Sequence, residues 1–443
     1  MRLWAGVVLL AACGGEKGGE EAPTDTASAG VVTTTESSTP AGQGTVTPPR
    51  DWCPSLSVTA TLTLGPGDDL QGALDAAVPG DIIALEAGLY ELDIDPLVIA
   101  TDGITLIGAT GQASDVTVDG TYGPSDLLWI QASDVTVAHI TFRRSFFRGV
   151  RITPPAGGLS DVELYGIVVE DTGAEAVLVE PDGAGSSFVD GGVVSCSTLR
   201  LTDEGRDRLR VACDAGGVAV RGGRDWSVRD NTIEGFWCPD LQARPAVFAG
   251  DGARGTVVER NRLNDVAVGV QLGEGSGGGR RGWDDSPCPE GAAQHYEGLV
   301  RNNMVAIVEG GLLESSSGFL SGVRLQSACE STVLHNTVYS DIAPAGAAIE
   351  FSHPTTTGVV ANNLTTHGLA RRDDALIVND TNYENAEAIL FLYPRDRDVH
   401  LNPGAADAVD DGSDAYLDLC PEDVDGQRRD ARPDMGADEL LFP

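Results

Sequence analysis

Val228-Arg-Asp-Asn231-Thr-Ile233 is the most informative stretch of this sequence, because its pattern occurs five times in the chain. Each copy has an apolar residue, two variable positions, an asparagine, one variable position and a second apolar residue. The asparagines lie 30, 42, 33 and 26 residues apart, at Asn231, Asn261, Asn303, Asn336 and Asn362. Repeats at such periods indicate stacked structural units, and unequal spacing indicates loops inserted into single units. The pattern therefore predicts a solenoid.

Short β-branched segments between about residues 81 and 395 predict the strands of this solenoid. Examples are Ile104-Thr-Leu-Ile107, Val135-Thr-Val137 and Val218-Ala-Val220, which are too short for helices. Segments long enough for helical crossovers are missing between them, which argues against an α/β sheet. We expect coils stacked about 4.8 Å apart, each completing the backbone hydrogen bonds of its neighbour.

The five asparagines have a structural interpretation. An asparagine tolerates the left-handed backbone conformation that a sharp turn between strands requires. Stacked in register, their side chains would also hydrogen-bond to one another as a ladder along the axis. The alternative is that they are only turn residues of a meandering β-sandwich. A single row of asparagines distinguishes the ladder from the sandwich.

An amphipathic segment precedes the repeats and predicts a cap over the first coil. In DDLQGALDAAV (68–78) the apolar residues fall at helical spacing, and Asp68 or Asp69 can cap the N-terminus. Pro79-Gly80 then ends the helix. We therefore divide the body of the chain into an N-terminal cap (51–80), a parallel β-helix (81–400) and a C-terminal acidic segment (401–443).

This helix, the Pro79-Gly80-Asp81 turn, the next strand and Gly88-Leu-Tyr90 resemble the start of pectate-lyase-like right-handed parallel β-helix proteins. The resemblance covers about residues 60 to 400. It implies an all-β fold, a right-handed parallel β-helix solenoid with an N-terminal capping helix. It implies no particular activity, because this superfamily includes lyases, hydrolases, adhesins and inert stalks.

The last stretch, DVDGQRRDARPDMGADE (423–439), resembles a C-terminal motif of bacterial surface β-helix proteins. Met435 and Asp438 stand where such proteins often carry Ile and Tyr. The resemblance implies a surface location and no reaction. The acidic residues of the motif are candidates for holding calcium, although their spacing is not that of an EF-hand loop. Pairing with Arg428, Arg429 and Arg432 explains them equally well.

The start of the chain is typical of an export signal. Met1-Arg2 precedes an apolar run over residues 3–12, which is too short to span a bilayer. Leu10-Ala11-Ala12-Cys13 resembles the lipobox of bacterial lipoproteins, which implies cleavage before Cys13 and a lipid anchor on its thiol. The Gly-, Ser-, Thr- and Pro-rich residues 13–50 predict a disordered tether. We therefore expect an outer-membrane lipoprotein, periplasmic or exposed at the cell surface, whose membrane partner is reached through Cys13.

The charge and the cysteines narrow the class of partner. The 29 basic and 67 acidic residues give a net charge of −38, which argues against nucleic acids as partners.

An exported chain lies where disulfides persist, and Cys196 and Cys213 flank a polar insertion that they would close as a loop. No pair has the spacing of a zinc site, so we predict no metal site from the cysteines. The seven cysteines after Cys13 leave one unpaired, and their connectivity stays open.

Three insertions are the candidate functional loops, because loops on a rigid scaffold carry most binding sites. They span residues 195–215, 235–244 and 273–296. One hypothesis is a carbohydrate groove, in which aromatic rings stack on sugars, arginines bind uronate carboxylates and paired carboxylates act as acid and base. The alternative is that the tryptophans only pin their loops to the body. The candidate ligand-binding residues are Trp237, Trp283, Arg280, Arg281 and Tyr296, and the catalytic candidates are Asp240, Asp251, Arg254, Asp284 and Asp285.

The sequence lacks most of the residues that the known lyase and hydrolase mechanisms of this fold require. The one lysine, Lys17, lies in the tether, so a lyase would need an arginine base together with calcium. The polygalacturonase motifs are missing, since Asn231-Thr232 is followed by Ile233 and His353 lies between Ser352 and Pro354. We therefore predict a non-catalytic glycan-binding or structural and adhesive surface module whose partner is a polysaccharide or a cell-surface matrix. The alternative is a polysaccharide lyase or glycoside hydrolase acting on an extracellular, uronate-containing polysaccharide.

Overall fold

The computed structural model describes residues 52–56, 58–209, 213–288 and 291–441. These residues belong to one compact unit. The expected signal peptide (1–12), the tether (13–50) and the lipidation site Cys13 lie outside the described residues. Within the described ranges, no helix is long and apolar enough to cross a membrane.

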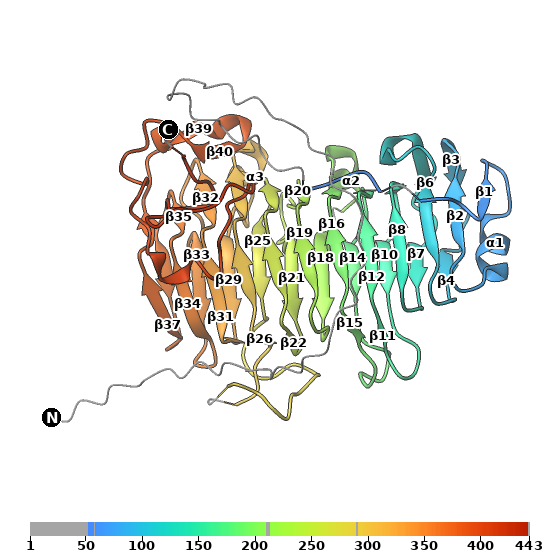
Figure 1. Ribbon diagram of the computed structural model, residues 1–443, viewed down its shortest axis with the longest axis horizontal. Coiled ribbons are helices and arrows are strands. Elements are labelled where there is room, and N and C mark those ends of the chain that lie inside the picture. The colour runs from blue at the N-terminus through green and yellow to red at the C-terminus, as the bar shows by residue number, and fades with distance from the viewer. Residues whose placement is uncertain (1–51, 57, 210–212, 289–290, 442–443) are drawn as a thin grey trace, which may run out of the picture. The chain divides into compact units, whose positions relative to one another are not determined.

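Successive coils contribute strands to three long parallel sheets (Figure 1). Sheet A contains β1 (Leu62–Leu64), β2 (Ile82–Leu85), β5 (Thr105–Gly108), β8 (Val135–Ala138), β12 (Val162–Tyr165), β16 (Val193–Ser195), β19 (Ser227–Arg229), β23 (Val257–Glu259), β27 (Leu299–Arg301), β31 (Ser331–Leu334), β34 (Thr357–Ala361) and β37 (Leu376–Asp380). Sheet B contains β3 (Gly88–Glu91), β6 (Val116–Asp119), β9 (Thr141–Arg143), β13 (Val168–Glu170), β17 (Thr198–Arg200), β20 (Thr232–Glu234), β24 (Arg262–Asn264), β28 (Met304–Ile307), β32 (Thr337–Ser340), β35 (Leu364–Thr365) and β38 (Tyr383–Glu384). Sheet C contains β4 (Leu97–Ile99), β7 (Asp126–Ile130), β10 (Arg148–Ile152), β14 (Glu175–Val179), β18 (Gly216–Arg221), β21 (Val247–Gly250), β25 (Val268–Leu272), β29 (Ser321–Gln326), β33 (Ile349–Ser352) and β36 (Leu369–Arg371). The chain is therefore a right-handed parallel β-helix.

The remaining strands and the helices lie outside these three sheets. The short parallel strands are β11 (Leu159–Ser160), β15 (Val189–Asp190), β22 (Ala253–Arg254), β26 (His295–Tyr296) and β30 (Ala328–Cys329), and β39 (Phe391–Tyr393) pairs antiparallel with β40 (Asp398–Leu401). The helices are α1 (Leu70–Ala76), α2 (Asp203–Arg208) and α3 (Gly310–Glu314), with short 3-10 turns at Ala113–Asp115, Ala388–Leu390, Pro394–Asp396 and Asp414–Tyr416.

Helix α1 is the capping helix expected from the sequence. The side chain of Asp69 accepts a hydrogen bond from the backbone N–H of Gly72 at 2.9 Å, as an N-cap does. Leu70 and Leu74 are buried in the main core, so the apolar face of the helix covers the first coils. The helix ends at Ala76, two residues before the end of the predicted segment.

The core of the solenoid is a column of aliphatic side chains. Equivalent residues of sheet A stack in register from coil to coil, each with 1% or less of its surface exposed. Each such side chain contributes on the order of 1.5–3 kcal/mol relative to its exposed state, which explains why every coil repeats an apolar residue here. One row of sheet A runs through Ile83, Leu106, Val137, Leu164, Val194, Val228, Val258, Val300, Val333 and Val360.

A ladder of buried asparagines runs beside this column. Each Nδ2 donates to the Oδ1 of the next asparagine at 2.8–3.0 Å. Four of the five expected residues are rungs, but the fifth rung is Asn363 and not Asn362. Val333 pairs with Val360, so the register of this coil begins one residue later than the sequence pattern at Val359 suggested. The rungs are Asn231, Asn261, Asn303, Asn336, Asn363 and Asn382.

The turn conformation was assigned to the wrong residue. The residue before each of the first five rungs, and not the rung itself, has the left-handed backbone, with φ between +50° and +59°. Asn362 is one of these residues, and its side chain bonds the main chain of Ser413 instead of a neighbouring rung. It therefore fastens the C-terminal extension, here defined as residues 388–441, to the last coils.

The C-terminal extension packs against the outer face of sheet B. Met304, Tyr339 and Leu364 form a second buried cluster with apolar residues of the extension. The fully buried guanidinium of Arg429 pairs with Glu439 at 3.0 Å and donates to Asn302 Oδ1 at 2.9 Å. Arg429 thus pairs within the 423–439 motif, as one of the two interpretations expected, whereas Arg432 pairs with Asp410 outside the motif at 3.0 Å.

Among the described residues, three disulfides join distant segments: Cys53–Cys196, Cys213–Cys238 and Cys288–Cys329. The expected closure of a loop by Cys196 and Cys213 is wrong. Cys196 directly follows β16 and is bonded to Cys53 in the segment before β1. Cys213 is bonded to Cys238 and so joins the first insertion to the second. Cys420 is an unpaired, buried thiol.

Candidate functional site

The outer face of sheet C carries a continuous row of side chains. Because neighbouring strands are in register, one outward residue from each strand lies about 4.8 Å from the next. The row is apolar in its middle, where Leu178, Ala219 and Phe248 form a small cluster, and polar or aromatic on both sides. From coil to coil it runs through Trp129, Arg151, Leu178, Ala219, Phe248, Gln271, Arg324 and Glu350.

Arginines and carboxylates alternate around this row. Three glutamates each lie beside two guanidiniums. Glu175 lies between Arg148 and Arg221, Glu274 between Arg221 and Arg244, and Glu350 between Arg324 and Arg372. Two rings carry guanidiniums: Arg151 over Trp129 at 5.1 Å and Arg221 over Phe248 at 4.9 Å.

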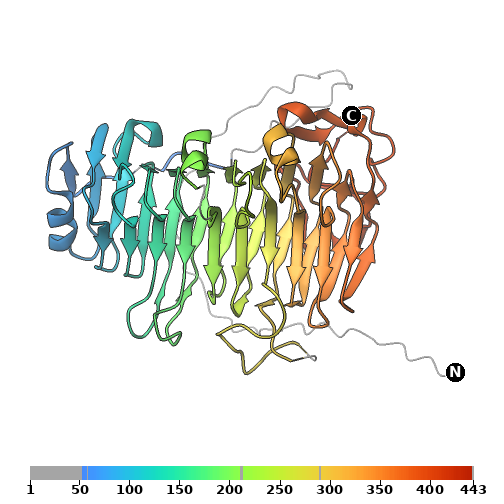
Figure 2. The same cartoon turned by 180° about the vertical axis from the view of Figure 1, so that it is seen from behind.

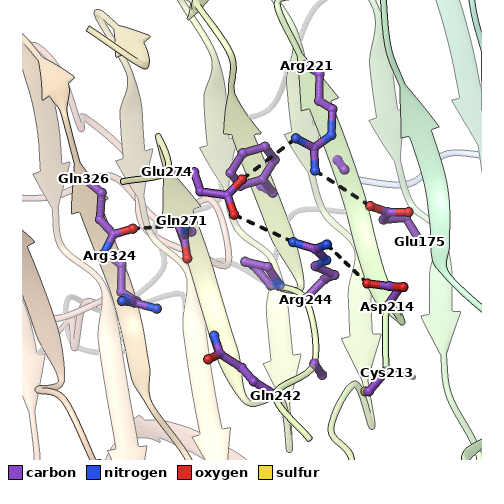
Figure 3. A pocket seen from close by; sticks show the side chains of 14 residues that line it. Glu175, Cys213, Asp214, Arg221, Gln242, Arg244, Gln271, Glu274, Arg324 and Gln326 are labelled. Atoms are coloured by element: carbon purple, nitrogen blue, oxygen red, sulfur yellow. Dashed lines mark hydrogen bonds and ion pairs between the residues drawn. The ribbon is translucent and has the colours of Figure 1, made fainter. Parts of the chain in front are cut away.

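A cavity of about 430 Å³ opens over the middle of this row (Figure 3). Its floor consists of outward residues of sheet C, among them Phe248 and Gln271. Its rim comes from the three insertions, which supply Asp214, Arg244 and Glu274. The Cys213–Cys238 disulfide joins the first two of these insertions at the rim. Figure 3 shows Glu274 reaching Arg221 on one side and Arg244 on the other.

Three of the arginines of this face, Arg148, Arg221 and Arg324, are incompletely hydrogen-bonded. The carboxylate oxygens nearest Arg148, Arg221 and Arg324 lie 3.6–3.9 Å away, and no hydrogen bond joins these guanidiniums to another described residue. The Nε of Arg148 is buried without a partner. Elsewhere the chain pairs arginines tightly, as in Arg281–Asp190 at 2.6 Å. The outer face of sheet C therefore presents N–H donors that a ligand can use.

Most of the residues predicted from the sequence gather in the third insertion instead, where they bond to one another. Arg281 pairs with Asp190 and packs over Trp283 at 4.2 Å, and the Trp283 Nε1 donates to the carbonyl of Gly252. Arg254 donates hydrogen bonds to both Asp285 and Glu297, and these bonds raise the pKa of Arg254. The bond from Arg254 also lowers the pKa of Asp285.

The other predicted residues of this insertion also have local roles. Arg280 pairs with Asp251 at 3.0 Å, and Asp251 also accepts a bond from the Arg280 main chain. Tyr296 is buried, and its hydroxyl accepts from the N–H of Ala293. Asp284 is exposed. These contacts attach the loop to the body and place none of these residues in the sheet C cavity.

Trp237 lies far from this group. Its ring carries the guanidinium of Arg206 on α2 at 4.0 Å and packs close to Gly311 on α3. Asp240 lines a separate cavity beside Trp237. Figures 1 and 2 place α2 and α3 along one edge of the sheets and the loop before β26 along the opposite edge. Trp237 and Trp283 therefore do not converge over one face, and the groove expected between them is not formed.

Sequence reasoning missed the residues of the cavity floor because they belong to strands, whereas the rim comes from the three insertions that the sequence did indicate. The signal was present in the alternation of the third strand of each coil. In Val218-Ala-Val220-Arg221 and Val270-Gln271-Leu272 the valines and leucine point inward and the intervening residues point outward. Outward Arg, Gln and Phe at successive coils would have indicated a polar surface.

The motif at 423–439 offers few oxygens for calcium. Asp423, Asp434 and Glu439 are buried, and their carboxylates accept backbone N–H groups of the same extension. Burial raises the pKa of Asp423 to about 7. The described residues contain one group suited to a metal, formed by His400, Asp425 and Asp438. Burial opposes the charged form of His400, but the nearby carboxylates of Asp425, Asp438 and Asp398 outweigh it and raise the pKa of His400 to about 9.

No protein-family model matches the chain, and no curated protein matches it. Solved structures are similar at low identity. A pectate lyase, Pel9A, is 12% identical with a TM-score of 0.47, over 87% of this chain and 98% of its own. An alginate lyase from Paenibacillus sp. str. FPU-7 is 16% identical with a TM-score of 0.46, over 74% and 100%. The surface adhesin PfbA of Streptococcus pneumoniae is 12% identical with a TM-score of 0.42, over 73% and 97%. At these identities and TM-scores the similarity carries no conclusion about what this chain binds or catalyses.

Proposed function

We propose that this protein is a non-catalytic surface module that binds a linear polysaccharide along the outer face of sheet C. The observation that carries the proposal is the set of incompletely bonded guanidiniums, Arg148, Arg221 and Arg324, spaced along one row of strands. Arginine forks bind carboxylates in pairs of parallel hydrogen bonds. Phe248 and Trp129 add ring faces on the same surface, and Gln271 adds an amide.

The charge of this face suits such a ligand better than the rest of the chain does. Over the chain as a whole, acidic residues outnumber basic ones by 67 to 29, which would repel an anionic polymer. On the outer face of sheet C, six arginines pair with six carboxylates, so the local charge is balanced. The pairs are Arg148 with Asp126 and Glu175, Arg151 with Glu180, Arg221 and Arg244 with Glu274 and Asp214, and Arg324 and Arg372 with Glu350.

The arrangement favours binding over hydrolysis. Glycoside hydrolysis uses two carboxyl groups in unlike surroundings, one of which keeps its proton. Glu175, Glu274 and Glu350 have like surroundings, because each lies beside two arginines. A surface that alternates such pairs provides several equivalent contacts for a repeating polymer, which is what a binding module needs.

The start of the sequence supports display of this surface outside the cell. A lipid on Cys13 and the Gly-, Ser- and Pro-rich stretch after it would hold the β-helix at a membrane on a flexible tether. Metabolic labelling with a fatty-acid analogue tests this part of the proposal. Loss of the label in Cys13→Ala is expected, and a label that persists in the variant contradicts the anchor.

A panel of polysaccharides tests the binding function. The full chain is incubated with pectate, alginate, chondroitin and a neutral glucan, with and without calcium. We expect saturable binding to at least one carboxylated polymer, weaker binding to the neutral glucan, and no unsaturated or shortened products. Unsaturated products would identify a lyase, shortened saturated products a hydrolase, and the absence of binding across the panel would contradict the proposal.

A further inference from the structure

His400, Asp425 and Asp438 form a cluster on the C-terminal extension, away from sheet C. His400 lies on β40, and the two aspartates belong to the 423–439 motif. One ligand atom from each residue lies within 4.8 Å of the other two. The side chains of His400 and Asp425 keep 16% and 24% of their surface exposed, so an ion can reach them from solvent.

The imidazole of His400 is oriented by a second carboxylate. Nδ1 lies 2.5 Å from Oδ1 of Asp398, and the same oxygen accepts the backbone N–H of His400. When Nδ1–H donates to Asp398, the lone pair of Nε2 is left on the side of Asp425. Metal-binding histidines commonly have this outer carboxylate, which fixes the ring and its tautomer.

The distance between Nε2 of His400 and Oδ2 of Asp425 fits two ligands of one small metal ion better than it fits a hydrogen bond. His400 Nε2 lies 3.4 Å from Asp425 Oδ2, and Nε2 is buried with no hydrogen-bond partner. Two metal–ligand bonds of about 2.0–2.1 Å at a tetrahedral angle would hold their donor atoms about 3.3 Å apart. Asp425 has no other side-chain partner among the described residues, and Asp438 uses Oδ2 for the N–H of Leu401, which leaves Oδ1 for an ion.

We propose that His400, Asp425 and Asp438 bind one divalent transition-metal ion of the zinc class, with water completing the coordination. Imidazole and carboxylate together suit zinc and similar ions. Calcium prefers six to eight oxygen ligands and is excluded by the nitrogen donor and the small number of oxygens. The ion joins β40 to the 423–439 motif and so holds two parts of the C-terminal extension together.

Calorimetric titration of the full chain, stripped with a chelator and carrying no histidine tag, tests the site directly. We expect one Zn²⁺ per chain with a dissociation constant of about 10 µM or tighter, and a higher unfolding temperature in zinc than in the same concentration of calcium. His400→Gln should abolish this binding, and Asp398→Asn should weaken it about 10–100-fold, because Asp398 acts only by orienting the ring.

The matched control is His367→Gln, because His367 is also partly buried but bonds Thr366 outside the cluster. It should bind zinc as the wild type does. A wild-type chain with no saturable zinc binding overturns the proposal, whatever the variants do, and leaves His400 as the cation of an ion-pair cluster only. Equal zinc affinity in wild type, His400→Gln and Asp398→Asn also overturns it.

Discussion

The guanidinium of Arg221 lies 4.9 Å from the centre of the Phe248 ring, and the two residues belong to the neighbouring strands β18 and β21. Arg221 also approaches Glu175 and Glu274 at 3.9–4.0 Å without a hydrogen bond to either. The ring therefore supports a cation whose donors are still available to a ligand. This pair lies in the middle of the sheet C row and marks the centre of the proposed binding surface.

Replacing Phe248 by alanine should weaken polysaccharide binding about tenfold, or roughly 1.4 kcal/mol, a size common for central aromatic contacts. The fold should persist, because the ring packs on the outer face with Leu178 and Ala219 and not in the main core. Affinity electrophoresis measures the effect. Tyr393→Ala is the control, since Tyr393 is an exposed aromatic of the C-terminal extension and should leave the affinity unchanged.

The disulfide Cys213–Cys238 should matter for affinity as well as stability. It joins the two insertions that supply Asp214 and Arg244 to the rim of the cavity. The double variant Cys213→Ser/Cys238→Ser should lose about 3 kcal/mol of unfolding free energy, for a loop of this length, and should also bind polysaccharide more weakly. Cys53→Ser/Cys196→Ser should lose stability alone. Equal affinities in both double variants would show that the rim does not take part in binding.

The asparagine ladder predicts a graded loss of stability. Asn303 both accepts from Asn261 and donates to Asn336, and all three side chains are buried. Asn303→Ala leaves buried groups on both neighbours without partners, so we expect a loss of about 2–4 kcal/mol in denaturant unfolding. Asn382→Ala removes the last, half-exposed rung and should cost about 1 kcal/mol. The reverse order would contradict the ladder as a stabilising element.

Acid should destabilise the fold through His295. Burial lowers the pKa of His295 to about 3, while its Nε2 bonds Thr256 Oγ1 at 3.0 Å. The unfolded chain takes up this proton near pH 6.5 and the folded chain only near pH 3. The contribution of neutral His295 to the free energy of unfolding is therefore fully present above pH 6.5. It declines between pH 6.5 and 3, by up to about 1.4 kcal/mol per pH unit. Unfolding of His295→Gln, measured from pH 7 to 4, should depend less steeply on pH than the wild type does.

The architecture could be predicted from the sequence because every coil repeats the same apolar and asparagine positions. Val228 and Val258 fill one column, and Asn231 and Asn261 bond to each other, so local pattern and global fold agree. The error at Asn362 arose where Val359 and Val360 both satisfied the pattern. Only the pairing of strands β31 and β34 decides between them.

The site was harder to predict because it depends on residues that share a face without sharing a motif. Arg221, Phe248 and Arg324 are far apart in sequence, and each alone reads as an ordinary strand residue. The loop residues predicted as a site are charged and aromatic, as binding residues commonly are. However, Arg254 and Arg281 donate their hydrogen bonds to neighbouring carboxylates, Asp285 and Asp190. Which arginines remain available is a property of the packed structure.

The most direct test of the account is the affinity of the full chain for the carboxylated polysaccharide it binds, measured for Arg221→Glu/Arg324→Glu against wild type at two salt concentrations. We expect the affinity to fall at least 30-fold, or about 2 kcal/mol, because two donors become repelling carboxylates. Arg395→Glu, a charge reversal at an exposed site on the C-terminal extension, should bind as the wild type does. Undiminished binding by the double variant would show that the outer face of sheet C is not where the polysaccharide binds.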